Sequence, residues 1–388
     1  MTHRQIPFNK SYIAGRELYY IAQAVANGDL KGDGPFTKRC ARWFEERMDI
    51  PACLLTHSCT GALELSAMLL NLEQDDEVIL PSFTFTSTAN AFLLRGCKLV
   101  FADIDPETLN ICPKEIERRI TDKTKAICVV HYAGVACDMD AIMALSEKYS
   151  IPVVEDAAHA VIAKYKGKYL GTFGALGTFS FHETKNYSSG EGGALLINDP
   201  KLKNRAEILR EKGTNRSQFF RGEVDKYSWV DIGSSFLPSE IISAFLYGQL
   251  EHADSINDER LRLWNMYYQR LTPLQEQGLL RLPIVPEGCE HNAHMFYILI
   301  PDPETKEALR KYMNERGCSA VFHYLPLHAA IMGKRLGNQE HLPVTERIAE
   351  TLLRLPLYCG LEDCDVDQIC STLEAFMLEK SLQKVSGA

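Results

Sequence analysis

The residue with the clearest chemical potential is Lys185, in the segment Phe179-Ser180-Phe181-His182-Glu183-Thr184-Lys185-Asn186. It follows an apolar run and precedes a loop rich in glycine and serine, residues 189–193. A lysine amine attacks a carbonyl only when it is deprotonated, and burial or a neighbouring cation promotes that state. Most lysines are solvated. A catalytic role for Lys185 is therefore supported only if other segments supply groups that act with it.

An acid stands at the end of another apolar run, in Glu155-Asp156-Ala157-Ala158-His159. A buried carboxylate is costly without a partner, and a cationic ring nitrogen would supply one. Taken alone, the same acid could equally cap the segment that follows it.

The segment Thr56-His57-Ser58-Cys59-Thr60-Gly61 precedes a stretch of helix formers that extends to Leu72. Serine and threonine are preferred at helix N-caps, and glycine lets a ligand approach the backbone. Free N–H groups and the helix dipole would make this terminus an anion site. A plain capped helix is the alternative.

These three signals form a set. A Schiff-base lysine, an acid for a pyridine nitrogen and a phosphate site are the parts that pyridoxal phosphate requires. Other phosphate-binding signatures are missing, because residues 171–177 do not match GxGxxG and no GxxxxGK[ST] sequence occurs. The combination therefore predicts a pyridoxal-phosphate site.

Short apolar runs, which suit strands buried on both faces, occur at residues 77–80, 97–101, 126–130, 152–154, 178–181 and 194–197. Helical patterns occur between them, at residues 61–72, 114–120 and 139–149. The alternation predicts a mostly parallel α/β sheet, with ligands beyond the carboxyl ends of its strands. A long helix at 259–271 begins a smaller α+β region, so we expect domains at residues 1–250 and 251–388.

Bulk properties narrow the class of protein. The chain has 388 residues and a net charge of −9, which argues against a nucleic-acid binder. We expect a cytoplasmic protein, because no signal peptide or membrane span is recognisable. We expect no metal site, because the clusters with metal-ligand side chains lack zinc-type spacing; they are Cys289 with His291 and His294, and Cys359 with Cys364 and Cys370.

The motifs at residues 156–159, 179–186 and 190–193 resemble the DegT/StrS family of sugar aminotransferases, and the likeness extends from Ile6 to about Phe376. The resemblance implies a fold type I pyridoxal-phosphate enzyme, with a large domain, a smaller C-terminal domain and a homodimer with shared active sites. It also implies a role for each matching residue. Lys185 would bind the cofactor covalently and Asp156 would pair with its ring nitrogen. The other implied cofactor contacts are Cys59, Thr60, Gly61 and Ser180 at the phosphate, Phe85 on the ring and His159 beside it.

The segments at residues 30–34, 130–137 and 210–222 resemble one branch of that family most closely. That branch aminates C4 of a dTDP-linked 4-keto-6-deoxy sugar with L-glutamate, for the enterobacterial common antigen. The resemblance places His323 and Tyr324 on the sugar side. Lys212, Arg216 and Arg221 are candidates for binding a diphosphate or a carboxylate, although each could equally be a solvated surface charge.

One departure and several alternatives stay open. Many relatives carry an asparagine that reaches the cofactor phosphate of the partner subunit, where this chain has Leu237. The same fold could act on a 3-keto sugar or on a UDP- or GDP-linked 4-keto sugar. The family's dehydratases carry histidine in place of Lys185, which argues against that reaction. A cofactor-binding sensor without turnover is the non-enzymatic alternative.

Overall fold

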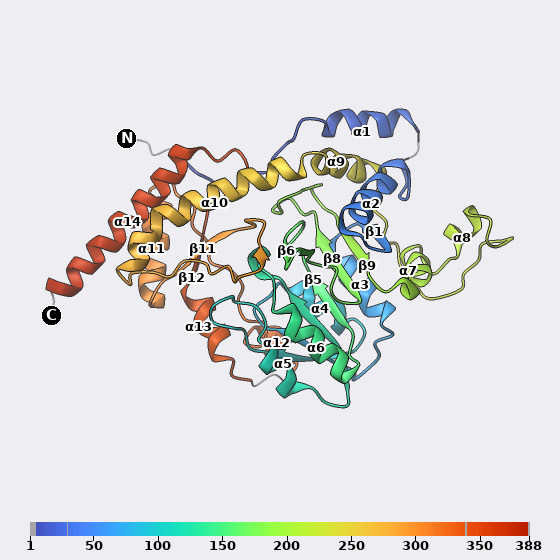
Figure 1. The fold of residues 1–388 in the computed structure, drawn as a ribbon, viewed down its shortest axis with the longest axis horizontal. Coiled ribbons are helices and arrows are strands. Elements are labelled where there is room, and N and C mark those ends of the chain that lie inside the picture. Colours follow the sequence, from blue (N-terminus) through green and yellow to red (C-terminus); the bar gives the residue numbers. More distant parts are fainter. Residues whose placement is uncertain (1–4, 29, 338–339, 387–388) are drawn as a thin grey trace.

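A seven-stranded sheet in the order β1-β9-β8-β5-β4-β2-β3 forms the centre of the computed structural model, which describes residues 5–28, 30–337 and 340–386 (Figure 1). Its strands are β1 (Ala52–Thr56), β2 (Glu77–Pro81), β3 (Lys98–Ala102), β4 (Thr124–Val130), β5 (Val153–Asp156), β8 (Leu176–Ser180) and β9 (Gly193–Ile197). Only β9 runs antiparallel to its neighbours in this sheet. The predicted mostly parallel α/β sheet is confirmed. Each of the six predicted strands is present, and β1 is an addition.

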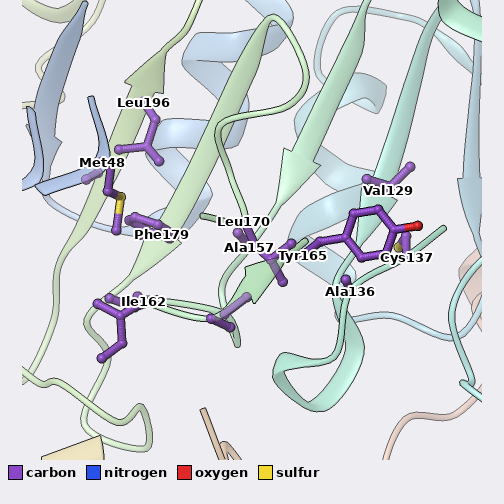
Figure 2. Packing of buried hydrophobic residues seen from close by; sticks show 14 of the residues in the cluster. Met48, Val129, Ala136, Cys137, Ala157, Ile162, Tyr165, Leu170, Phe179 and Leu196 are labelled. Atoms are coloured by element: carbon purple, nitrogen blue, oxygen red, sulfur yellow. The ribbon is translucent and has the colours of Figure 1, made fainter. Parts of the chain in front are cut away.

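Both faces of the sheet are buried, so successive strand residues enter different cores. Cys53 and Leu55 of β1 belong to the largest core cluster, whereas Ala52 and Leu54 belong to a cluster on the other face. Side chains alternate between the faces of a strand, so burial on both faces requires the continuous apolar runs seen in the sequence. Figure 2 shows part of the largest cluster, in which Phe179 of β8 lies near Met48.

Helices cover the two faces of the sheet. The face with the largest cluster packs against α2 (Pro35–Met48), α5 (Pro113–Arg119), α6 (Met139–Tyr149) and α9 (Glu240–Leu250). The opposite face packs against α3 (Cys59–Leu69), α4 (Thr86–Leu93) and α7 (Lys203–Arg210). The helix predicted from residue 61 begins earlier, at Cys59, because the Ser58 hydroxyl accepts the Gly61 N–H at 3.0 Å and caps it.

The C-terminal region has its own core. Strands β11 (Phe296–Leu299) and β12 (Leu352–Leu355) form a two-stranded antiparallel sheet. The helices of this region are α10 (Ala253–Glu276), α11 (Pro303–Glu315), α12 (Ile331–Arg335), α13 (Pro343–Thr351) and α14 (Asp363–Ser386). Ile6, from the other end of the chain, is buried in this core and forms a bridge with Cys318.

Helix α10 links the two cores without a break (Figure 1). Its first turns contribute Ala253 and Ile256 to the core of the large sheet, and later turns contribute Leu263 and Tyr267 to the C-terminal core. The domain boundary near residue 250 therefore stays a prediction, and the residues around Ile6 pack with the C-terminal part.

Smaller elements complete the chain. Strands β6 (Lys164–Tyr165), β7 (Lys168–Tyr169) and β10 (Cys289–Glu290) form a small sheet, and single 3-10 turns occupy Tyr132–Gly134 and Pro200–Leu202. Helix α1 (Glu17–Ala26) packs on α9. Helix α8 (Arg216–Phe220) and its flanking loop extend away from the body of the molecule (Figure 1). Within the described residues, every helix is too short or too polar to cross a bilayer.

Candidate active site

A cavity of about 790 Å³ lies where the carboxyl ends of the parallel strands meet the C-terminal region. Segments that follow β1, β2, β5 and β8 form one side, and residues on and around β11 and β12 form the other. Nine of the residues predicted to bind cofactor or sugar line it: Cys59, Thr60, Phe85, Asp156, His159, Ser180, Lys185, His323 and Tyr324. The cavity therefore gathers segments that are far apart in the sequence.

Lys185 lies in the turn after β8, where its backbone N–H donates to the His182 carbonyl at 2.9 Å. Desolvation of the amine, with a smaller contribution from the positive charge of Arg354, lowers the pKa of Lys185 to about 8. The negative charge of Asp156 opposes this shift without cancelling it. A substantial fraction of the amine is consequently neutral near pH 8, as a nucleophile or general base requires.

Asp156 is buried at the carboxyl end of β5. Its Oδ2 accepts the Thr88 hydroxyl at 2.7 Å and its Oδ1 accepts the Ala158 N–H at 3.1 Å. Burial raises the pKa of Asp156, while these two hydrogen bonds favour the charged form. The carboxylate is held in one orientation and faces the cavity, where it can accept a proton-bearing group from a ligand.

The N-terminus of α3 points at the cavity, which Ser58, Cys59 and Thr60 line. The Thr60 and Ser87 hydroxyls are 2.7 Å apart. β9 lies so close that a Cβ on Gly193 would come within 2.4 Å of the Cys59 nitrogen. Gly61 does not line the cavity, and its N–H already serves the Ser58 cap. The hydroxyls and the helix dipole together can hold an anion.

Neutral imidazole and phenol groups form the wall opposite α3. The Ala133 N–H donates to His159 Nδ1 at 3.3 Å, so the proton of this ring lies on Nε2, which is 3.2 Å from the Tyr324 hydroxyl. Burial lowers the pKa of His159 well below its usual value. The Tyr132 hydroxyl lies 2.7 Å from His323 Nδ1. These contacts fix the ring orientations before any ligand binds.

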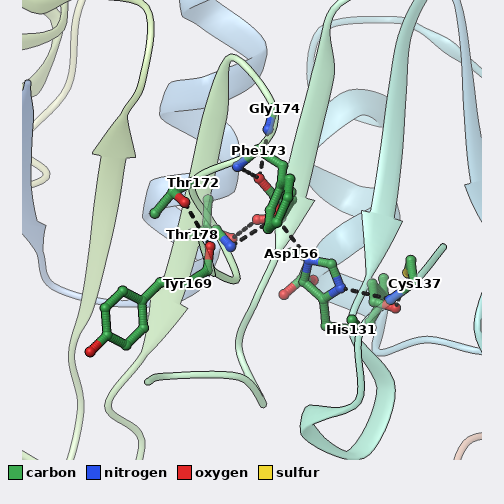
Figure 3. A network of polar contacts seen from close by, with 12 residues as sticks. His131, Cys137, Asp156, Tyr169, Thr172, Phe173, Gly174 and Thr178 are labelled. Carbon is green, nitrogen blue, oxygen red and sulfur yellow. Dashed lines mark hydrogen bonds and ion pairs between the residues drawn. The ribbon is translucent and has the colours of Figure 1, made fainter. Parts of the chain in front are cut away.

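Glu155, next to Asp156, anchors the surrounding loops. Figure 3 shows three of its partners, His131, Phe173 and Gly174. The buried Glu155 carboxylate accepts backbone N–H groups from three residues, Gly171 at 2.8 Å, Phe173 at 2.6 Å and Gly174 at 2.7 Å. It also lies 2.9 Å from Nε2 of His131, whose Nδ1 accepts the Cys137 N–H. In the glycine-rich segment 171–177, residues 171–175 form a loop that folds around this carboxylate, and residues 176–177 begin β8, which pairs with β5.

The structure does not bring Lys212, Arg216 and Arg221 to the cavity of their own chain. Arg216 pairs with Glu211 at 3.0 Å, and Arg221 pairs with Glu207 and Glu223 at 2.8 and 2.7 Å. They lie off this cavity because the segment that carries them extends outward with α8, and their role as substrate ligands stays a prediction. Leu237 also lies off the cavity, and the neighbouring Phe236 carbonyl accepts the His57 N–H at 2.7 Å.

Several cavity residues were not singled out from the sequence. Ser87, Thr88, His294 and Arg354 line the cavity, and Tyr132 supports it from behind. The sequence pattern groups His294 only with Cys289 and His291, whereas in the structure it stacks on His159 with ring centroids 4.2 Å apart. Within the described ranges, three or more potential metal ligands do not converge anywhere.

Comparison with known proteins identifies the family to which this chain belongs. Residues 11–374 match the model of the DegT/DnrJ/EryC1/StrS aminotransferase family. This chain belongs to that family. It is a pyridoxal-phosphate-dependent aminotransferase.

The chain is also similar to solved structures of aminotransferases and to a curated protein. The chain is 30% identical to the aminotransferase TlmJ from Streptoalloteichus hindustanus, with a TM-score of 0.89 over 97% of this chain and 99% of TlmJ. The PLP form of the putative sugar aminotransferase Spr1654 from Streptococcus pneumoniae is 25% identical, with a TM-score of 0.89 over 97% and 99% of the two chains. Protein MJ1066 from Methanocaldococcus jannaschii, which is uncharacterized, is 33% identical over 90% of this chain and 93% of its own.

The cavity fits pyridoxal phosphate. An anion-binding helix terminus, a hydrogen-bonded carboxylate and a desolvated lysine amine share one wall, which matches the phosphate, the ring nitrogen and the aldehyde of that cofactor. The close approach of Gly193 to Cys59 shows that β9 leaves no room for a side chain beside the helix terminus.

The Glu155 network gives a stability prediction. Replacing Glu155 with Gln leaves one acceptor oxygen and turns an amide NH₂ toward the donors that the carboxylate satisfied. We expect a loss of about 2–4 kcal/mol in the free energy of unfolding, because buried donors lose their partners. Chemical denaturation measures this loss. Glu117→Gln, at an exposed pair with Lys148, is the matched control and should change stability by less than about 1 kcal/mol. Equal effects in the two variants would contradict the role of Glu155.

Proposed function

We propose that this chain is a dTDP-4-amino-4,6-dideoxygalactose transaminase, which converts dTDP-4-keto-6-deoxy-D-glucose to dTDP-4-amino-4,6-dideoxy-D-galactose with L-glutamate as amino donor. The convergence of Lys185, Asp156 and the α3 terminus on one cavity carries the aminotransferase chemistry. The finer choice of sugar rests on the segments at residues 30–34, 130–137 and 210–222. With this sugar as substrate, the enzyme would belong to the pathway for the enterobacterial common antigen.

The residues of the cavity have different roles in the proposed reaction. Bound pyridoxal phosphate supplies an aldehyde that condenses with amines and a ring that delocalises the electrons released at the reacting carbon. Lys185 would hold the cofactor and then carry a proton to and from that carbon, since its lowered pKa leaves part of the amine neutral. Asp156 would keep a proton on the ring nitrogen.

The remaining contacts position the ligands. Thr60, Ser180 and the dipole of α3 would hold the phosphate. His159 and Phe85 would confine the ring, and His323 and Tyr324 would face the sugar. The Tyr324 hydroxyl accepts from His159 Nε2, which leaves its own proton available for a substrate oxygen.

We also propose that two copies of the chain form a dimer. The outward segment around α8 exposes large apolar side chains, with Phe220 at 70% and Trp229 at 77% of their full exposure. Such a cluster on an extension marks a protein contact surface. A second copy is the occupant we propose, because Phe85 and Leu325 also leave the rim of the cavity apolar and exposed, so the cavity stays open until a partner covers it.

The lowered pKa of Lys185 gives a test of its role. We expect the rate at which pyridoxal phosphate recombines with cofactor-free protein to rise about tenfold per pH unit below a pKa of about 8 and to level off above it. The reason is that only the neutral amine reacts. Stopped-flow absorbance measures the rate. A plateau that extends down to pH 6 would contradict this role.

Two variants control this experiment. Lys185→Ala should bind the cofactor without covalent attachment, as borohydride reduction and peptide mapping would show, and should lose transamination. Lys148→Ala, at an exposed lysine of α6, should keep both covalent attachment of the cofactor and transamination. An active Lys185→Ala protein would refute the proposed chemistry.

The choice of sugar is tested with a panel of keto-sugar nucleotides. We expect the highest kcat/KM with dTDP-4-keto-6-deoxyglucose and L-glutamate, and an axial amine at C4 of the product by NMR. Preference for a 3-keto sugar or a UDP- or GDP-linked sugar, or an equatorial amine, would move the enzyme to another branch of the family. Failure to release 2-oxoglutarate with every keto sugar would favour a non-catalytic sensor.

The proposed dimer is tested by sedimentation velocity. The wild-type protein should sediment with twice the mass of one chain, and Phe220→Asp with Trp229→Asp should shift it toward the monomer, because two charges would enter an apolar contact. Leu382→Asp, at an exposed apolar position on α14, is the matched control. A wild-type monomer, or a double variant that stays dimeric, would overturn the proposed surface.

A further inference from the structure

A single turn after β4 contacts two histidines of the cavity. The turn spans Tyr132–Gly134, and Asn110 holds it in place. Asn110 Oδ1 accepts the Tyr132 N–H at 2.8 Å, and Nδ2 donates to the carbonyls of the two residues after the turn at 3.1 and 2.9 Å. Ala133 lies in the left-handed region with a φ of 58°, a strained conformation that persists only where the surrounding structure enforces it. The groups of this turn are therefore fixed before any ligand binds.

The turn presents one hydrogen-bonding group to each ring. The Ala133 N–H lies 3.3 Å from His159 Nδ1, and a backbone N–H can only donate. The Tyr132 hydroxyl lies 2.7 Å from His323 Nδ1. A phenol can donate or accept, so its surroundings decide which of these two atoms carries the proton.

Burial decides the direction of the hydrogen bond between Tyr132 and His323. Tyr132 is 1% exposed, and among the described residues its hydroxyl has no hydrogen-bond partner other than His323 Nδ1. If the ring nitrogen donated, the phenol proton would stay buried without an acceptor, which is costly. Tyr132 therefore donates. Burial also lowers the pKa of His323 well below its usual value, so the ring is neutral and its one proton lies on Nε2.

Nε2 of His323 is available to a ligand. The ring lines the cavity and stacks on Tyr324, with centroids 3.7 Å apart. Within the part of the chain that the structure describes, this nitrogen has no hydrogen-bond partner. His294 has the opposite tautomer, because its Nδ1 lies 2.9 Å from Oδ1 of Asn186, which can only accept. Each ring thus takes the tautomer that the group beside its Nδ1 requires.

We propose that Tyr132 is a positioning residue that fixes His323 as a hydrogen-bond donor to an oxygen of the keto sugar. The identity of this ligand rests on the proposed function, in which His323 faces the sugar. Carbonyl and hydroxyl oxygens of a sugar accept hydrogen bonds, so they need a protonated nitrogen on the wall. Without the Tyr132 hydroxyl, the neutral ring could carry its proton on Nδ1, and Nε2 would then present a lone pair to the same oxygen.

Nitrogen NMR of the holoenzyme with isotope-labelled histidine tests the tautomer. His323→Gln identifies the signals of this ring by removing them. In the wild-type protein we expect a proton on Nε2 and an unprotonated, hydrogen-bonded Nδ1. Tyr132→Phe keeps the buried ring, and it should move both signals toward the average of the two tautomers. A wild-type proton on Nδ1, or unchanged signals in Tyr132→Phe, would overturn the proposal.

Single-turnover kinetics of the two half-reactions test the effect on the substrate. In Tyr132→Phe we expect the keto-sugar concentration that gives the half-maximal rate to rise about three- to tenfold, because one hydrogen bond is weakened. The value for L-glutamate should stay nearly unchanged. Tyr297→Phe is the matched control, since this buried tyrosine lies 5.9 Å from the Tyr132 ring and outside the cavity lining. Equal losses in the two half-reactions would indicate a merely structural role and contradict the proposal.

A double-variant cycle separates an effect through His323 from a direct one. The amide of His323→Gln can donate whatever residue 132 supplies, so adding Tyr132→Phe to this variant should change the keto-sugar reaction little. Effects that multiply independently would show that Tyr132 acts by another route. If the wild-type protein transfers no amino group to any keto sugar, the proposed function fails, whereas the nitrogen signals still report the tautomer.

Discussion

The amine of Lys185 lies where desolvation outweighs the attraction of nearby negative charge, and the candidate chemistry depends on that balance. A fully solvated lysine would remain protonated at neutral pH and could neither attack an aldehyde nor accept a proton. The turn after β8 places the amine inside the cavity, while the charge of Asp156 limits how far its pKa falls. Movement of the amine into solvent would restore an ordinary lysine, whereas loss of the Asp156 charge would lower the pKa of Lys185 further.

Parallel strands make this arrangement possible. Because β1, β2, β5 and β8 run in the same direction, the segments that follow them open at one edge of the sheet. The anion site, the carboxylate and the lysine come from three of these segments. The antiparallel strand β9 lies between β1 and β8, and Gly193 allows it to approach the start of α3. The sheet thus sets the spacing between the groups without any contact among them in sequence.

The C-terminal region and His159, which follows β5, close the cavity with groups of a different character. His159, His294 and His323 are held neutral by burial, so this wall offers hydrogen bonds without adding positive charge. Arg354 is the permanent cation of that wall among the described residues. The contrast suits two successive substrates, since an uncharged sugar ring and a carboxylate can use different parts of the same surface.

The sequence alone predicted six of the seven strands of the large sheet and the three segments that carry the main chemistry. Strands buried on both faces require apolar runs, and Asp156 and Lys185 lie at or shortly after the ends of two predicted runs, whereas β1, which precedes Ser58, was not predicted. The sequence could not separate Arg354, which lines the cavity, from Arg216 and Arg221, which lie on the outward segment and pair with acids at the end of α7. Local pattern describes neighbours along the chain, whereas burial and charge pairing depend on residues far apart in sequence. Only the tertiary structure therefore decided which cations face the cavity, that Glu155 anchors the loop around residue 173, and that Gly61 supports the helix cap behind it.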